Sequence, residues 1–205
     1  MTDTQQSAAR WHAHYSSPIG VLDIATNGHA ITGVWYQNQA HYPLPHELGE
    51  LIEDPRGIAA EAQEIADSIG QQAEEATEHD YVPAARLLSR TMAQLDEYFA
   101  RKRTEFDLPL DPEGTDFQLM VWEHLKTVPS GYTTTYGEIS RIVGPGAPAQ
   151  AVGQAVGRNK ISIIIPCHRV VGSHGDLTGY AGGIERKKFL LDLEEPEEVR
   201  AGRLF

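Results

Sequence analysis

Apolar and polar positions alternate in the first part of the chain and take helical spacing later, which predicts two structurally different regions. Residues 11–42 hold short alternating runs separated by turn signals, the strongest of which is Asn27-Gly28. They predict antiparallel strands, one of them over residues 31–36. Residues 84–100 then carry apolar side chains at helical spacing and predict an amphipathic helix. The acidic stretch between them, residues 47–80, has weak periodicity and predicts a solvated helix or a mobile insertion.

After a junction near residues 111–114, the pattern predicts helices. The first spans residues 116–127 and is stopped by Pro129 and Gly131. Its inward stripe is predicted to be Phe117, Met120, Val121, His124, Leu125 and Val128. The change of pattern at the junction predicts two domains, residues 1–112, which include the acidic insertion, and residues 113–205.

Two shorter helices follow, separated by a tight turn rich in glycine and proline. Residues Thr135 to Glu138 form a capping box that opens the first of them, and Gly144 ends it. Its inward side chains are predicted to be Ile139, Ile142 and Val143. Pro148 is predicted to be the first residue of the second helix, which runs to about Arg158.

The second of these short helices is unusually rich in alanine and glycine. Each glycine lowers helix stability by up to about 1 kcal/mol, so another requirement must favour small residues there. Small side chains allow a close approach to a neighbouring helix or to a narrow DNA minor groove. A helix-turn-helix and a helical hairpin that only packs against the protein are equal alternatives on spacing alone.

Charge and cysteine content narrow the possible functions. Residues 1–114 hold 7 Lys and Arg against 19 Asp and Glu, whereas residues 115–205 hold 10 of each, so the net charge of −12 lies in the first half. The second half could approach phosphate groups, although tight non-specific DNA binding is not expected. No apolar run is long enough for a signal peptide or a membrane span, and we expect a cytoplasmic protein. One cysteine excludes an internal disulfide, and no metal site is predicted.

The candidate chemistry centres on that single cysteine. The apolar run over residues 161–165 predicts a buried strand, and Pro166, Cys167 and His168 follow it. A thiolate is the reactive form of cysteine, and the imidazole could accept its proton directly or through a water. A carboxylate would then hold the far ring nitrogen. The candidates for that carboxylate are Asp176, Asp192 and Glu194. A buried structural cysteine beside an incidental histidine is the alternative.

The segment Pro166-Cys-His-Arg-Val170 resembles the active-site motif of the O6-alkylguanine-DNA alkyltransferases, the methylated-DNA–protein-cysteine methyltransferases. The similarity begins near Gly114 and continues to Lys188. Its other matching segments are Ala151-Val-Gly153, Gly157-Arg-Asn159, Leu177 to Gly183 and Glu185 to Lys188. The first half is similar only in size and in Ser17-Pro-Ile-Gly20. The resemblance implies an N-terminal α/β domain with a ribonuclease-H-like antiparallel sheet, then a mostly α-helical domain with a helix-turn-helix.

The resemblance also implies a function. Members of this family move an alkyl group, such as methyl, from O6 of guanine in double-stranded DNA onto their own cysteine. They bind through the minor groove and flip the nucleotide out of the duplex. The product thioether is stable, so each molecule acts once, and no cofactor is implied. We expect a monomer; cooperative binding along DNA and activity on O4-alkylthymine are left open.

Site residues follow from the same resemblance. Cys167, His168 and Glu194 match a cysteine–water–histidine–glutamate relay, Asn159 matches a residue that bonds near the active-site turn, and Tyr136 matches a tyrosine that contacts the 3′ phosphate and guanine N3. The matching substrate-pocket positions are Tyr180, Ala181 and Val170. The matching DNA-binding positions are Pro148, Ala149, Gln150, Ala151, Gly153 and Arg158.

Two positions depart from the family pattern. Gln150 stands where an arginine usually fills the gap left by the flipped base, and glutamine carries no charge and stacks less well. We therefore expect weaker DNA affinity or slower flipping. Lys160 stands where proline is common and is a candidate phosphate contact. A lesion sensor without transfer activity and an unrelated cysteine hydrolase are the alternative functions; the former class lacks the cysteine, and the latter needs an oxyanion hole for which no donors are evident.

Overall fold

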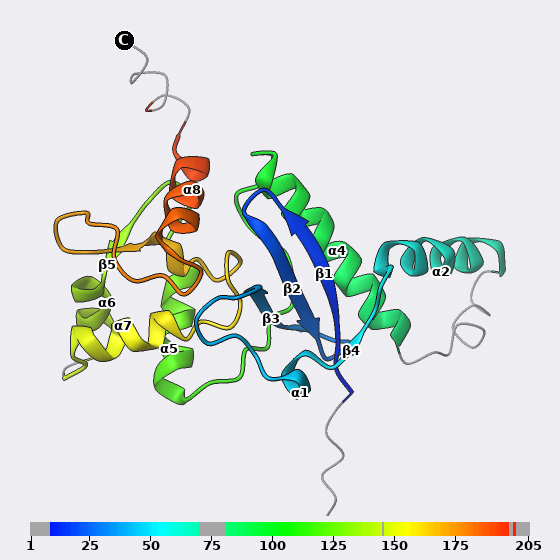
Figure 1. Cartoon of the computed structure of the whole chain (residues 1–205), viewed down its shortest axis with the longest axis horizontal. Coiled ribbons are helices and arrows are strands. Elements are labelled where there is room, and N and C mark those ends of the chain that lie inside the picture. The colour runs from blue at the N-terminus through cyan, green and yellow to red at the C-terminus, as the bar shows by residue number, and fades with distance from the viewer. Residues whose placement is uncertain (1–8, 70–80, 145, 197–198, 200–205) are drawn as a thin grey trace, which may run out of the picture.

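The computed structural model describes residues 9–69, 81–144, 146–196 and 199 of the chain. A sheet with one long helix along it, and a second helix that extends away from the sheet, lies beside a cluster of shorter helices (Figure 1). The sheet belongs to the first half of the sequence and the helical cluster to the second, as the change of pattern predicts. No helix in these ranges is both long and apolar enough to span a membrane.

The sheet has four strands in the order β3-β2-β1-β4. They are β1 (Trp11–Ser17), β2 (Gly20–Thr26), β3 (Ile31–Tyr36) and β4 (Glu50–Leu51). The first three pair antiparallel, and β4 pairs parallel with β1. The predicted turn between β2 and β3 is confirmed, and the side chain of Asn27 accepts hydrogen bonds there from the amides of His29 and Ala30.

Helix α4 (Tyr81–Phe99) packs across β1 and β2 and buries Leu88, Met92 and Leu95. It begins three residues earlier than the pattern predicts, because Pro83 lies in the first turn, where its missing N–H has no partner to lose.

The acidic stretch 47–80 is structured over much of its described part. It includes the end of α1 (Pro45–Leu48), then β4 and α2 (Pro55–Ile69), which packs against α4. Residues 70–80 lie outside the described ranges.

The second half contains α5 (Asp116–Lys126), α6 (Tyr136–Val143), α7 (Ala149–Gly157) and α8 (Ile184–Glu194). Strands β5 (Thr134–Thr135) and β6 (Val170–Val171) form a short parallel pair between them. The predicted capping box of α6 is present, since Thr135 and Glu138 bond reciprocally.

Three details of the predicted helices are wrong. Met120 and Ile142 are 47% and 61% exposed and do not face inward. In α5 the inward place is taken by Trp122, whose indole N–H donates to the carbonyl of Ala155 at 2.9 Å, and this turns Met120 outward. Pro148 is the N-cap of α7 and not its first residue, because its backbone is still extended.

The free edge of β3 joins the two halves. The amide of Ile31 donates to the carbonyl of Pro109 at 2.8 Å, so the linker between the halves pairs with this edge. Further along, the amide of Val34 donates to the carbonyl of Lys160 at 2.8 Å, and the amide of Ser162 donates back to Val34 at 2.9 Å. The edge strand thereby fixes the segment that leads to Cys167.

Candidate active site

Cys167 follows a buried tight turn. The prediction of a buried strand over residues 161–165 is therefore wrong. Ile161 pairs with Val34 through a single bridge, after which the backbone bonds locally: the amide of Ile165 donates to Ile161 at 2.9 Å, and that of Cys167 donates to Ile165 at 2.8 Å. Ile163 has a φ of 72°, a left-handed conformation that is rare for a β-branched residue. An apolar run buries equally well in either conformation, so its hydrophobicity could not distinguish them.

Asn159 braces this turn and directs a donor at the sulfur. Its Nδ2 lies 2.8 Å from the carbonyl of Ile165 and 3.1 Å from Cys167 Sγ, and its Oδ1 accepts from the amide of Ile161 at 3.0 Å. Burial raises the pKa of the Cys167 thiol, although the amide of Asn159 and the charge of Lys187 oppose the shift. The resting cysteine is therefore a protonated thiol at neutral pH.

His168 lies in the short 3₁₀ helix η2 (Cys167–Arg169), and its imidazole is fully buried. Its Nε2 lies 2.8 Å from Oε1 of Glu194. Of the three candidate carboxylates, Glu194 is therefore the one that contacts the imidazole. Burial lowers the pKa of His168, although the carboxylate opposes the shift. The neutral ring then carries its proton on Nε2. Nδ1 has no hydrogen-bond partner among the described residues and is free to accept a proton.

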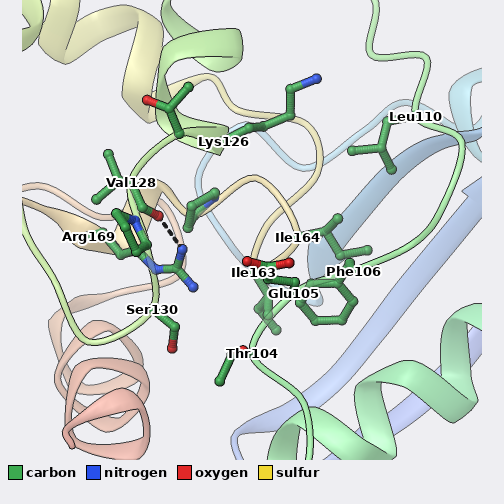
Figure 2. A pocket seen from close by; sticks show the side chains of 13 residues that line it. Thr104, Glu105, Phe106, Leu110, Lys126, Val128, Ser130, Ile163, Ile164 and Arg169 are labelled. Carbon is green, nitrogen blue, oxygen red and sulfur yellow. Dashed lines mark hydrogen bonds between the residues drawn. The ribbon is translucent and has the colours of Figure 1, made fainter.

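Glu194 is held by more than the histidine. Arg169 donates from Nε to Oε2 at 2.8 Å and from Nη2 to Oε1 at 2.9 Å, and Tyr98 donates its hydroxyl to Oε1 at 2.7 Å. Arg169 is anchored in turn to the carbonyl of Val128 (Figure 2). Although burial by itself raises the pKa of Glu194, His168 and Arg169 hold it far below its usual range. The carboxylate is therefore ionised at neutral pH.

Lys187 was missed as a site residue by the sequence analysis. Its side chain is fully buried, and its Nζ donates to the carbonyls of Val170 at 2.5 Å and Thr178 at 2.6 Å. Burial lowers its pKa to about 8. Among the described residues only the charge of Cys167 offsets this, so the lysine and a thiolate would stabilise each other. Its place in the segment Glu185 to Lys188 was the only sequence signal.

The predicted pocket residues lie on a segment that contacts both halves of the protein. The hydroxyl of Tyr180 donates to that of Tyr36 in β3 at 3.2 Å, and the amide of Ala40 donates to the carbonyl of Ala181 at 3.1 Å. A Cβ at Gly182 would lie 2.7 Å from the Tyr36 ring, so only glycine fits there. The N-terminal half therefore forms part of the wall beside Cys167, which the sequence did not indicate.

Tyr136 bridges this segment and the exposed face of α7. Its hydroxyl donates to the carbonyls of Thr178 at 3.2 Å and Gly179 at 3.4 Å. Its ring lies 3.8 Å from where a Cβ on Gly153 would be.

The predicted DNA-binding positions line two cavities along α7. The opposite face of α7 buries Val152, Ala155 and Val156. The exposed face lines a shallow cavity of about 710 Å³. This cavity is lined by His41, Tyr136, Ala149, Gln150, Gly153, Gln154, Gly157 and Arg158. Pro148 and Ala151 line an adjoining cavity of about 410 Å³. Packing and an open small-residue surface thus occupy different sides of the same helix.

Lys160 is not placed as a free phosphate contact. Its Nζ lies 2.7 Å from Oε1 of Glu47 and 4.0 Å from Oε2 of Glu113. It therefore pairs mainly with Glu47, a carboxylate of the first half, and this pair helps to hold the two halves together.

The histidines of β1 are close to each other but do not gather a metal site. The rings of His12 and His14 are 5.6 Å apart, and Nδ1 of His14 lies 2.5 Å from the buried carboxylate of Asp23. Within the described ranges, no group of three or more His, Cys, Asp or Glu side chains could hold an ion.

Comparison with known families covers nearly all of the described chain. A model described as "6-O-methylguanine DNA methyltransferase, ribonuclease-like domain" matches residues 11–112. The "6-O-methylguanine DNA methyltransferase, DNA binding domain" model matches residues 116–196. The chain belongs to the 6-O-methylguanine DNA methyltransferase family. The implied fold, a ribonuclease-like domain followed by a helical DNA-binding domain, is confirmed.

Individual members of this methyltransferase family are similar over most of their length. A methylated-DNA–protein-cysteine methyltransferase of Mycobacterium leprae (strain TN) is 46% identical over 189 residues, which cover 92% of this chain and 94% of that protein. The crystal structure of the Mycobacterium tuberculosis O6-methylguanine methyltransferase has a TM-score of 0.68 at 37% identity, covering 94% of this chain and 98% of that one. A structure of the M. tuberculosis protein in complex with DNA has a TM-score of 0.68 at 38% identity, with coverages of 92% and 96%.

Proposed function

We propose that this methyltransferase repairs double-stranded DNA by moving an alkyl group from O6 of guanine irreversibly onto Cys167. The observation that carries the proposal is the arrangement around the sulfur: a single buried cysteine is held by Asn159 and stands next to a histidine whose far nitrogen is fixed by Glu194. Such an arrangement suits a nucleophile that is activated only when its proton is removed. The DNA complex of a relative supports DNA as the partner.

In the proposed reaction His168 accepts the thiol proton at Nδ1 through a water, and Glu194 stabilises the imidazolium that forms. The sulfur then attacks the alkyl carbon, the S–C bond forms, and the C–O6 bond breaks. The departing guanine takes up the proton, so atoms and charge balance without a cofactor. The thioether is stable toward water and thiols, and the chain has no second cysteine that could serve as the nucleophile, so each molecule reacts once. The same step would act on O4-alkylthymine if the pocket admits that base.

Base flipping is part of the proposal, because O6 inside a duplex cannot reach a buried sulfur. The exposed face of α7 would lie in the minor groove, with Ala149, Gly153 and Arg158 against the backbone and Gln150 in the gap left by the base. Tyr136 would exchange its bonds to Thr178 and Gly179 for the guanine and its 3′ phosphate.

The proposal is tested by intact-mass spectrometry after incubation with excess duplex that carries one O6-methylguanine. The expected result is the addition of one methyl group per protein, on Cys167, and none in a Cys167→Ala control. Binding to the lesion without methylation would contradict the proposal and indicate a lesion sensor.

Replacing Gln150 with arginine is expected to raise the repair rate on duplex DNA. Arginine adds a charge and a planar group that stacks well, so it should stabilise the flipped state by about 1 kcal/mol, or roughly fivefold in rate. Single-turnover methylation of duplex and of single-stranded substrate measures this. The single-stranded rate serves as the control, since no partner base is left behind. An unchanged duplex rate would contradict the role given to Gln150.

A further inference from the structure

The hydroxyl of Tyr98 connects the N-terminal half to the proposed relay. Tyr98 belongs to α4, near the end of that helix, and donates to Oε1 of Glu194 at 2.7 Å. Its side chain is 2% exposed, and its ring packs against Phe99 and Phe106 at centroid distances of 5.4 and 5.5 Å. Burial and these ring contacts therefore fix the direction in which the hydroxyl donates.

The oxygen that accepts from Tyr98 is the same one that accepts from His168. Each hydrogen bond to this oxygen neutralises part of the negative charge of the carboxylate. A carboxylate with more donors therefore stabilises the imidazolium form of His168 less. Burial raises the pKa of Tyr98 well above its ordinary value, and the charge of Glu194 adds to the shift. Tyr98 is therefore a neutral donor at any physiological pH.

Few other charged or titratable groups face this position. Tyr98 faces Glu194, Arg169, Tyr36 and Tyr180, and His168 faces Glu194, Arg169 and Lys187. Arg169 belongs to the same short helix as the histidine and cannot be altered without removing two bonds to the carboxylate. Tyr98 donates a single bond, which makes its contribution separable.

We propose that Tyr98 is a positioning residue that limits the basicity of Glu194 and thereby holds Cys167 and His168 in their neutral forms. This inference rests on the proposed relay. A protein that uses its cysteine once gains from a latent thiol, because a free thiolate would react with oxidants and other electrophiles before a lesion is bound. The N-terminal half would then control reactivity as well as support the fold.

The test is Tyr98→Phe, which keeps the ring and removes the hydroxyl. In this variant Glu194 keeps its bonds to His168 and Arg169. Its Oε1 no longer accepts from Tyr98, so the carboxylate stabilises the imidazolium more strongly and favours the thiolate–imidazolium pair. Iodoacetamide alkylates thiolate with loss of iodide, and the one cysteine makes intact mass a direct readout. Near neutral pH we expect Y98F to react about threefold faster than wild type, because a larger share of its Cys167 is thiolate. At alkaline pH, where Cys167 is fully ionised in wild type and in Y98F, the reaction rates of the two proteins should converge.

Tyr15→Phe is the matched control. Tyr15 is 6% exposed and donates its hydroxyl to a carboxylate outside the relay, Oδ1 of Asp96, at 2.9 Å. The iodoacetamide rate of Y15F, plotted against pH, should follow that of the wild type. A Y98F curve that coincides with the wild type, or differs by the same factor at every pH, would overturn the proposal and leave Tyr98 a purely structural role.

A measurement on the wild-type protein covers the case in which Y98F does not fold. The ¹³C chemical shift of Tyr98 Cζ reports the hydrogen bond of its hydroxyl. This shift should change at the pH at which Cys167 ionises. A shift that does not change with pH across that range overturns the proposal. Neither readout uses DNA, so their failure is distinct from a failure of methyl transfer, which would instead contradict the proposed function.

Discussion

Replacing Glu194 with glutamine should abolish most methyl transfer and strongly destabilise the protein. The carboxylate side chain is 2% exposed and accepts four hydrogen bonds, three of them from His168 and Arg169 and one from Tyr98. Glutamine offers one oxygen and turns an NH₂ group toward one of these donors. Breaking one partner of a buried ion pair costs about 3–5 kcal/mol, which would lower Tm by about 10 °C.

The loss of activity has a separate cause. Without the carboxylate the imidazolium is not stabilised, so the proton of Cys167 has no good acceptor, and the transfer rate should fall at least about 100-fold. Single-turnover methylation at a temperature where the variant is folded measures this. Glu47→Gln is the matched control, because Glu47 pairs with Lys160 near the surface and should cost at most about 1 kcal/mol with no loss of rate. Equal rates in E194Q and wild type would remove Glu194 from the relay.

The pH dependence of stability follows from the same carboxylate. The pKa of Glu194 is lowered in the folded protein, so its contribution is present above about pH 4, the unfolded value, and is lost as the pH falls toward the folded one. The stability difference between wild type and E194Q should therefore narrow in acid.

Much of this fold could be predicted because each half has a clear hydrophobic period. The alternation of β1 and the helical spacing of α4 describe single elements whose burial is one-sided, and local turn and capping residues mark the ends of the predicted elements. The prediction was wrong for one segment that is buried on all sides. The run before Cys167 has no polar face, so its periodicity carries no information, and it folds as a turn with Ile163 left-handed.

The site could be predicted only where residues are adjacent in sequence or match the family motif. Cys167 and His168 are neighbours, whereas the choice among three carboxylates rests on the family resemblance in the sequence and on the 2.8 Å contact with Glu194 in the structure. Tyr98 and Tyr36 could not be found in this way. Both lie in ordinary apolar patterns of the first half and reach the site only because β3 and the linker bring the two halves together.

Replacing Lys187 with methionine should slow transfer while changing stability little near neutral pH. Two opposing effects act on stability: the buried cation is no longer desolvated, but the carbonyls of Val170 and Thr178 lose their donor, at about 1–3 kcal/mol each. For the thiolate there is no compensation. Loss of the positive charge should raise the pKa of Cys167, so the iodoacetamide and methyl-transfer rates should fall about tenfold. Lys188→Met, which removes an exposed neighbouring charge, should leave both rates unchanged.

The sign of the pH dependence separates this charge effect from a packing defect. Lys187 has a pKa of about 8 in the folded protein and about 10.4 when unfolded, so between these values the unfolded chain binds more protons. The free energy of unfolding of the protein with Lys187 should therefore rise with pH across that window. In K187M this rise should be absent. The comparison is made in proteins that also carry Cys167→Ala, because the thiol titrates in the same range with the opposite sign. Parallel curves for the two proteins would mean that burial does not lower the pKa of Lys187. A rise that already begins below neutral pH would mean that Lys187 is uncharged there, and its support of the thiolate would then have to be abandoned.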